Sequence, residues 1–291
     1  MASEQGTYYV PEQSKLPIFA SLGLFLTVFG AANWMNGNET GPSIFFCGSL
    51  LFAFVLWTWF SIVISENMAG LNEAKVKRSY VWGMGWFIFS EVMFFAAFFG
   101  ALYYIRAFSV PWLGGEGAKG ISGDMLWPNF QAVWPLMTNP SPELFPGPTS
   151  IIDAWHLPLL NTILLVTSSI TVTFAHHALK VGKRTSLTMW LGATIILGLT
   201  FLFFQGEEYV EAYNTMDLTL QSGIYGSTFF LLTGFHGAHV TLGTLMLIIM
   251  FFRVRKGHFD KENHFAFEAT SWYWHFVDVV WLGLFVLVYI I

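Results

Sequence analysis

Glu91 is the residue of this chain with the clearest capacity for chemistry. It lies near the centre of residues 83–105, an apolar run that holds no other charged residue. As a helix, this run is long enough to cross the roughly 30 Å hydrocarbon core of a bilayer. An ionised carboxylate at that depth costs about 3 kcal/mol on insertion scales, so we expect Glu91 to be neutral, paired or turned towards the protein interior. Two interpretations remain open: a protonated carboxyl group satisfied by one neighbour, or a functional or lipid-linked acid.

Two histidines in a later apolar run are the candidate partners of Glu91. His236 and His239 are three residues apart, so both can face one neighbouring helix. A metal site is the alternative, because imidazole binds haem iron and copper. A metal usually needs three or four ligands, however, and only His275 and Asp278 could add to the set. We therefore favour a hydrogen-bonded, structural or proton-linked role and expect neither a metal site nor a catalytic residue in this chain.

Two further groups of polar residues lie where apolar runs end. The tandem pair His176 and His177 is expected to have a wet, interfacial role. Basic residues between the sixth and seventh runs attract anionic lipid head groups, by on the order of 1 kcal/mol each. A purely topogenic role explains these basic residues equally well.

The elements that must position these groups are apolar runs of spanning length. Hydrophobicity on all sides over about 20 residues predicts a membrane-spanning helix, and open strands are excluded in lipid. The sequence therefore predicts an all-α, polytopic membrane protein. The seven predicted spans cover residues 16–34, 43–64, 83–105, 157–178, 187–206, 224–252 and 267–290.

The charges of the connecting segments support this number of spans. With a cytoplasmic N-terminus, all but two of the 13 basic residues fall in segments on the inner side, and Arg106 and Lys119 are the exceptions. This asymmetry follows the positive-inside rule, with the C-terminus outside. The connection between spans five and six is expected to be an acidic outer loop. Residues 107–156, rich in Pro, Gly and Trp, are expected to form a folded outer loop.

Composition excludes several other classes of protein. The chain is 55% hydrophobic and only 11% charged, whereas soluble domains carry about 25% charged residues. No basic face for nucleic acid is present, and no signal peptide is recognised at the start. Cys47, the one cysteine, excludes an internal disulfide and any site that needs two thiolates. We expect Cys47 to be a small buried apolar residue.

Several longer strings resemble subunit III of haem–copper cytochrome c oxidases of the bacterial type, and the resemblance covers nearly the whole of residues 1–291 as a single domain. The most specific strings are Thr233-Gly-Phe-His236-Gly-Ala-His239-Val and the segment from Phe267 to Trp281. The other strings are Phe87-Ile-Phe-Ser-Glu91-Val-Met-Phe-Phe, Leu159-Leu-Asn-Thr-Ile-Leu-Leu-Val, Ala175-His-His-Ala, Gln205-Gly-Glu-Glu-Tyr209 and Gly226-Ser-Thr-Phe-Phe.

This resemblance implies a two-helix and a five-helix group around a cleft that holds phospholipid. It implies that haem and copper lie in partner subunits I and II, subunit I being the main contact, and that this subunit supports catalytic lifetime and proton uptake. It matches Glu91 to a buried glutamate beside His239. It maps seven residues onto the lipid cleft: Trp59, Glu66, Arg253, Lys256, His258, His264 and Glu268.

Two departures and two rival functions accompany the resemblance. The 107–156 loop exceeds the compact versions of the family and resembles bacterial rather than mitochondrial chains. Ser65 stands where family members carry an arginine, which weakens one expected lipid anchor. A quinol oxidase subunit is the nearest rival, but such subunits typically lack the first two helices. A proton-coupled transporter would need repeated halves and broken helices, and neither pattern is present. The bacterial inner membrane is inferred from the resemblance alone.

Overall fold

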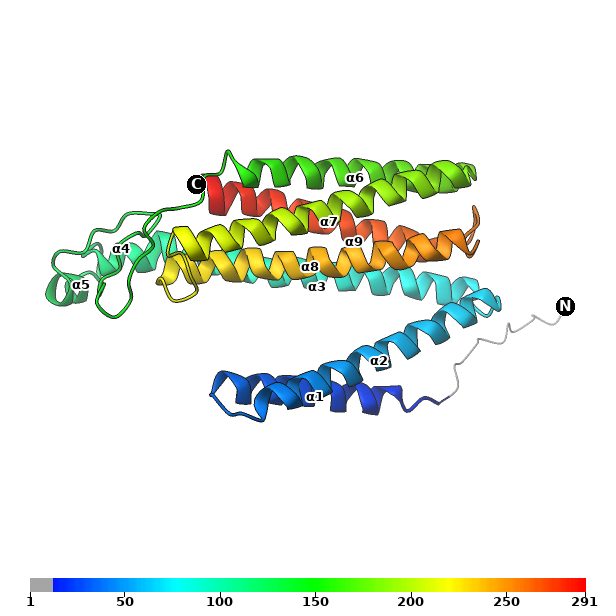
Figure 1. The fold of residues 1–291 in the computed structure, drawn as a ribbon, viewed down its shortest axis with the longest axis horizontal. Helices are drawn as coiled ribbons and strands as arrows, with labels where there is room; N and C mark the ends of the chain where they lie inside the picture. Colours follow the sequence, from blue (N-terminus) through cyan, green and yellow to red (C-terminus); the bar gives the residue numbers. More distant parts are fainter. Residues whose placement is uncertain (1–12) are drawn as a thin grey trace. The chain divides into compact units, whose positions relative to one another are not determined.

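Seven helices of the structure, a computed structural model that describes residues 13–291, are long and apolar enough to cross a membrane. The predicted all-α, seven-span fold class is confirmed, and no strand occurs in the described residues. The spans, shown in chain order in Figure 1, are α1 (Leu16–Met35), α2 (Gly41–Met68), α3 (Ala74–Tyr104), α6 (Leu157–Val181), α7 (Arg184–Thr215), α8 (Ile224–Arg255) and α9 (Phe265–Leu284). A π-helical turn, η2 (Phe285–Ile290), extends the last span.

The chain divides into two compact units, one ending at Tyr80 and the other covering Val81–Ile291. The first unit contains α1 and α2, which pack closely because glycines lie at their contact. A Cβ on Gly30 would lie 2.2 Å from the amide nitrogen of Phe45, and a Cβ on Gly48 would lie 2.4 Å from that of Thr27. Small residues of this kind allow helix backbones to approach in lipid, where no hydrophobic force drives association.

In the second unit, α6 to α9 form a bundle in which α9 contacts both α6 and α8. The α9 residues Trp274 and Trp281 are fully buried. Their indole N–H groups donate to Ser168 Oγ and Thr162 Oγ1 on α6, each over 2.9 Å. A buried indole needs such a partner, so these bonds fix the rotation of α9 against α6.

Large aromatic side chains join α3 to α8 and α9. Phe94 contacts Phe235 on α8 with ring centroids 5.1 Å apart, and Phe95 contacts Phe276 on α9 at 6.1 Å. Because these rings lie one turn after Glu91, they determine which side of α3 the carboxylate faces.

The acidic loop expected between spans five and six is mostly helix. α7 continues past residue 206 to Thr215, so Glu207, Glu208 and Glu211 are helical. Glutamate is a good helix former, and Glu208 is also held by tertiary contacts. Its side chain is buried, and its Oε1 accepts a 2.5 Å hydrogen bond from the Tyr289 hydroxyl on η2.

The expected 107–156 loop begins later than predicted, because α3 continues through a π-helical turn, η1 (Ile105–Ser109), and α4 (Val110–Leu113). The remaining segment, which includes α5 (Ile121–Leu126), is folded as expected. The Asn139 amide donates to the Ser222 carbonyl, and the Thr149 amide to that of Met216. The loop is thus fastened to the connection between α7 and α8.

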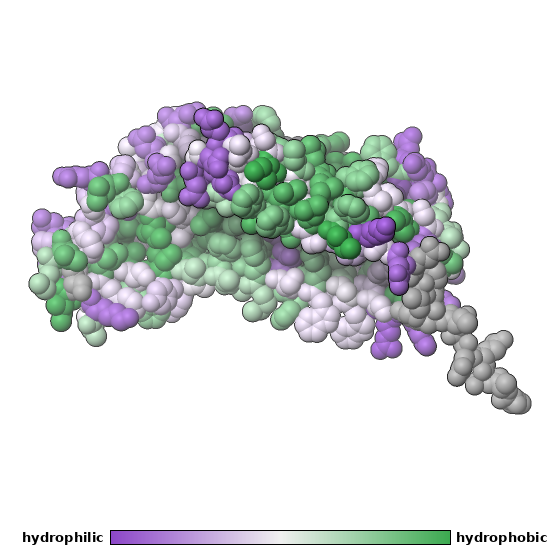
Figure 2. Space-filling view, turned by 90° about the horizontal axis from the view of Figure 1, so that it is seen from below, coloured by the Kyte–Doolittle hydropathy of each residue, from purple (hydrophilic) through white to green (hydrophobic). Residues whose placement is uncertain are grey.

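The surface of the protein is largely apolar. Figure 2 shows hydrophobic residues over the middle of one face and most hydrophilic residues towards its two ends. Cys47 is exposed, so the expectation that it is buried is wrong. An apolar side chain on a membrane-spanning helix can face lipid instead of protein. Its hydrophobicity alone therefore does not predict that it is buried within the protein.

Candidate functional site

Glu91 on α3 and His239 on α8 are in direct contact. The Nε2 atom of His239 lies 2.8 Å from Oε2 of Glu91, and the two side chains are 16% and 21% exposed, respectively. The other ring nitrogen, Nδ1, lies 2.6 Å from the carbonyl oxygen of Phe235. A carbonyl oxygen only accepts hydrogen bonds, so Nδ1 is the donor of that bond.

The contact between Nε2 and the carboxyl group therefore needs one further proton. That proton is held either by the ring, giving an imidazolium–carboxylate pair, or by the carboxyl group, giving a neutral acid and a neutral imidazole. Both arrangements have no net charge. A neutral pair avoids most of the cost of an isolated charge in an apolar medium. This explains how the carboxyl group of Glu91 is tolerated within an apolar span.

Aromatic rings enclose this pair. The ring of Phe95 lies 4.9 Å from the His239 ring in an edge-to-face contact, and the ring of Phe94 lies at 5.8 Å. The ring of Tyr273, itself fully buried, is nearly parallel to the imidazole at 6.5 Å. These rings restrict the access of water and strengthen the electrostatic interaction between the two side chains.

His236 does not join the pair, although the spacing predicted that both histidines could face one helix. Its Nε2 lies 3.1 Å from the carbonyl oxygen of Val277 on α9, and its ring packs against Trp281 and Phe201. The side chain is fully buried. Three residues advance a helix by about 300°, so the two histidines are about 60° apart. This difference is enough to turn His236 towards α9 while His239 faces α3.

The seven residues expected to line a lipid cleft belong to both units. Trp59, about half exposed, and Glu66 lie on α2 in the first unit. The other five lie in the second unit, where α8 ends and α9 begins: Arg253, Lys256, His258, His264 and Glu268.

Arg253 is the most constrained of these basic residues. Its side chain is 7% exposed, its guanidinium lies 4.5 Å from the centre of the Phe259 ring, and its Nε is buried without a hydrogen-bond partner. Among residues 13–291, no carboxylate forms a salt bridge with it. A buried guanidinium without a carboxylate is suited to bind an anion such as a phosphate group.

His258 adds no charge to this region at neutral pH. Burial, together with the positive charges of Arg253 and Lys256, lowers the pKa of His258. Its backbone amide donates to the carbonyl oxygen of Arg253, which ties the segment after α8 to the last turn of that helix.

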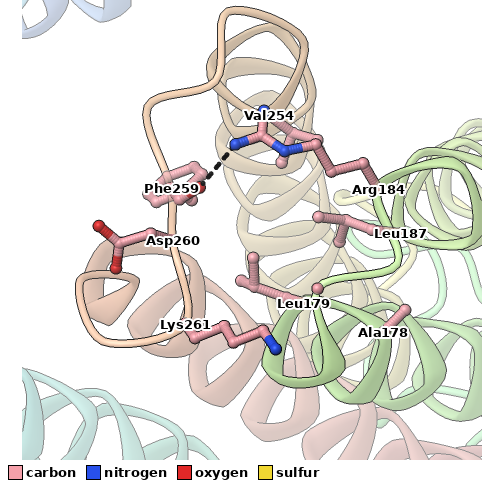
Figure 3. A pocket seen from close by; sticks show the side chains of 9 residues that line it. Ala178, Leu179, Arg184, Leu187, Val254, Phe259, Asp260 and Lys261 are labelled. Carbon is pink, nitrogen blue, oxygen red and sulfur yellow. Dashed lines mark hydrogen bonds between the residues drawn. The ribbon is translucent and has the colours of Figure 1, made fainter.

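A small hollow of about 210 Å³ lies at the junction of α6, α7 and α8, where Val254 and Phe259 contribute to its lining. Figure 3 shows Arg184 reaching from the start of α7 to the carbonyl oxygen of Phe259, to which it donates over 3.5 Å. Lys261 packs over Gly182 at the end of α6, and the Asp260 carboxylate points away from the hollow. The lining residues are Ala178, Leu179, Gly182, Arg184, Leu187, Val254, Phe259, Asp260 and Lys261.

Sequence reasoning did not identify Tyr273, Arg184 or the contacts of His176. No sequence pattern distinguished Tyr273 from the other residues of its apolar run. Arg184 was noted only as one of the basic residues expected on the inner side of the membrane. His176 was noted only as half of a tandem pair. Its ring lies 5.6 Å from that of His264, a contact between residues distant in sequence that no local pattern reveals.

Comparisons with known proteins match nearly the whole chain to one family. The family model described as Cytochrome c oxidase subunit III matches residues 6–118 and 127–291. The chain is 38% identical to a cytochrome c oxidase subunit 3 from Arabidopsis thaliana over 288 residues, 99% of this chain and 97% of the relative. It is 36% identical to a protein of the same name from Oncorhynchus mykiss over 290 residues, 99% of this chain and 98% of the relative. The chain therefore belongs to the cytochrome c oxidase subunit III family.

Proposed function

We propose that this chain is a non-redox subunit of a proton-pumping cytochrome c oxidase. In that complex, subunits I and II hold the haem and copper that carry electrons to O₂. The chain stabilises subunit I, its main contact, holds phospholipid and supports proton uptake. The observation that carries this proposal is the Glu91–His239 pair. A carboxyl group that is hydrogen-bonded to an enclosed imidazole suits a structural or proton-linked role and carries no electrons.

Purification tests the assembly. The chain, tagged at one end and extracted in mild detergent, is expected to bring with it haem-bearing subunits I and II. Complexes from which the chain has been removed should begin turnover at the normal rate but lose activity within fewer turnovers. Recovery of the chain without haem proteins, or an unchanged catalytic lifetime after its removal, would contradict the proposal.

The phospholipid role rests on Arg253 and the groups around it. A buried guanidinium without a carboxylate, next to the exposed Lys256, supplies positive charge where the bundle meets the membrane surface. Trp59 and Glu66, in the first unit, are proposed to contact phospholipid as well.

Replacing Arg253 with Ala should lower the amount of anionic phospholipid that is retained on purification. Arg255→Ala is the matched control, because Arg255 is exposed and lies two residues further along the chain. Equal lipid content in the two variants would remove this assignment.

The proposed location is the bacterial inner membrane, with the N-terminus in the cytoplasm and the C-terminus in the periplasm. The concentration of basic residues in alternate connecting segments supports this orientation. A reporter that is active only in the periplasm should give a signal at the C-terminus and none at the N-terminus. Signals from both ends, or from neither, would be inconsistent with an odd number of spans.

A further inference from the structure

Three potential metal ligands meet where α6 ends and α9 begins. They are His176 on α6, His264 immediately before α9, and Glu268 in the first turn of α9. One ligand atom from each lies within 4.8 Å of the others. All three side chains are half-buried, so they are shielded from bulk solvent and still accessible to an ion.

His264 is held in an orientation that leaves one ring nitrogen for a ligand. Its Nδ1 lies 3.1 Å from the carbonyl oxygen of Asp260, to which it donates, so Nε2 is the nitrogen left for a ligand. The Asp260 carboxylate in turn accepts hydrogen bonds from the amides of Glu262 and Asn263, at 2.8 and 2.6 Å. Histidines that bind metals usually donate their second ring nitrogen in this way, which fixes both the tautomer and the direction of the ring.

His176 contributes a nitrogen with no other partner. Its Nε2 is buried and makes no hydrogen bond among the described residues. A buried polar atom without a partner is costly, and a bound cation would satisfy it. The neighbouring His275 has its own partner, since its Nδ1 lies 2.6 Å from the hydroxyl of Ser169.

The chemistry of the three ligands indicates zinc. Two imidazoles and one carboxylate form a recurrent zinc ligand set, with bonds of about 2.0–2.2 Å and a fourth position left for water. Tetrahedral geometry at such bond lengths needs ligand atoms about 3.4 Å apart. Rotations that move each side chain by on the order of 1 Å would close the cluster around an ion. The carboxylate of Glu268 also offsets the positive charge of Lys180, which lies one turn after His176.

We propose that His176, His264 and Glu268 bind one Zn²⁺, with water as the fourth ligand. The ion joins the end of α6 to the start of α9 and fixes the segment that connects α8 to α9. This assignment departs from the expectation that the chain has no metal site, and it takes His264 and Glu268 out of the proposed lipid contacts. Zinc does not change its redox state, so the ion is compatible with a non-redox subunit.

A zinc titration of the purified, chelator-treated full chain in detergent tests the proposal. Calorimetry should show one saturable Zn²⁺ per chain, and X-ray absorption at the zinc edge should show two imidazoles and further oxygen ligands at about 2.0 Å. Glu268→Gln keeps the shape of the side chain and should weaken binding at least tenfold, as should His264→Ala. His177→Ala is the matched control: His177 is exposed, adjacent to His176 and outside the cluster, and this variant should bind like the parent chain.

The helix content of each variant, measured by circular dichroism, shows whether it is folded. A folded parent chain without saturable zinc binding would overturn the proposal. A Glu268→Gln variant that binds as tightly as the parent chain would do the same, because the metal would then lie elsewhere. Neither result would affect the proposed lipid and assembly roles, which are measured by phospholipid content and by recovery of haem proteins.

Discussion

Glu91 and His239 are 148 residues apart in the sequence, and their side chains meet in a hydrogen bond of 2.8 Å. The charge that each side chain can carry in this apolar environment therefore depends on the presence of the other. Removing one side chain leaves the other without its balancing group in an apolar environment, whereas replacing both removes the need for balance. This dependence distinguishes a coupled pair from two polar residues that are merely adjacent.

Replacing Glu91 with Gln is expected to leave electron-transfer turnover of the assembled complex largely intact. The amide of Gln donates to Nε2 of His239, so the hydrogen bond is kept and the pair stays neutral. Turnover with reduced cytochrome c, measured at equal haem content, checks this prediction. Immediate and complete loss of turnover in a normally assembled complex would show that the carboxylate is catalytic.

Replacing His239 with Ala is expected to destabilise the chain by about 1–3 kcal/mol, since it leaves a partly buried carboxyl group without a partner. Adding Glu91→Gln to this variant should recover part of the loss, because a neutral amide is less costly to bury than a carboxylate. Unfolding in increasing detergent denaturant, measured for both single variants and the double variant, gives the coupling energy. Strictly additive losses would mean that the two residues are not coupled.

The residues alone left His236 and His239 as candidate partners of Glu91, only the resemblance pointed to His239, and neither predicted the surroundings of the pair. A carboxylate within an apolar run requires a partner, and the spacing of His236 and His239 allows either of them to face a neighbouring helix. The choice between His236 and His239 depends on a rotation of about 60° around α8, which is determined by Phe94, Phe95 and the tryptophans of α9. Such packing depends on the whole bundle and leaves no local pattern. The ligands of the proposed zinc site left no local pattern for the same reason, because His176 and Glu268 come from different helices.

The ends of the spans were predicted less well than their number. Apolar length and the alternation of loop charges fix how many times the chain crosses a membrane. Neither property shows that a helix continues after its apolar residues end. α7 continues for nine residues beyond its predicted end, because Glu208 finds a hydrogen-bond donor in Tyr289 near the end of the chain.

Replacing Gly30 with Ala is expected to separate α1 from α2. The added Cβ would lie 2.2 Å from a backbone nitrogen of the other helix, where no side chain can move aside. The cost of such overpacking is about 1–3 kcal/mol. Gly206→Ala on α7 is the control, because a Cβ there meets nothing within 4 Å, and alanine favours the helix by up to about 1 kcal/mol. Thermal unfolding of the two variants in one detergent should change in opposite directions; equal stability would argue against the close contact.

The stability of the chain should fall as the pH decreases below about 6.5, and His258 should account for part of that fall. Its pKa is lowered in the folded chain by burial and by the charges of Arg253 and Lys256, so the unfolded chain binds more protons between the folded pKa and the unfolded value of about 6.5. The stabilising contribution is therefore complete above that value and is lost as the pH falls through the folded pKa.

The pKa of Asp260 is also lowered, chiefly by hydrogen bonds from the amides of Asn263 and Glu262, but its contribution is lost only below about pH 3.9. Thermal unfolding between pH 5 and 8 thus separates the two groups. The His258→Gln variant should lose less stability over this range than the parent chain, whereas a His177→Gln control should lose as much. If His258→Gln follows the parent curve, protonation of His258 does not contribute to the stability of this region.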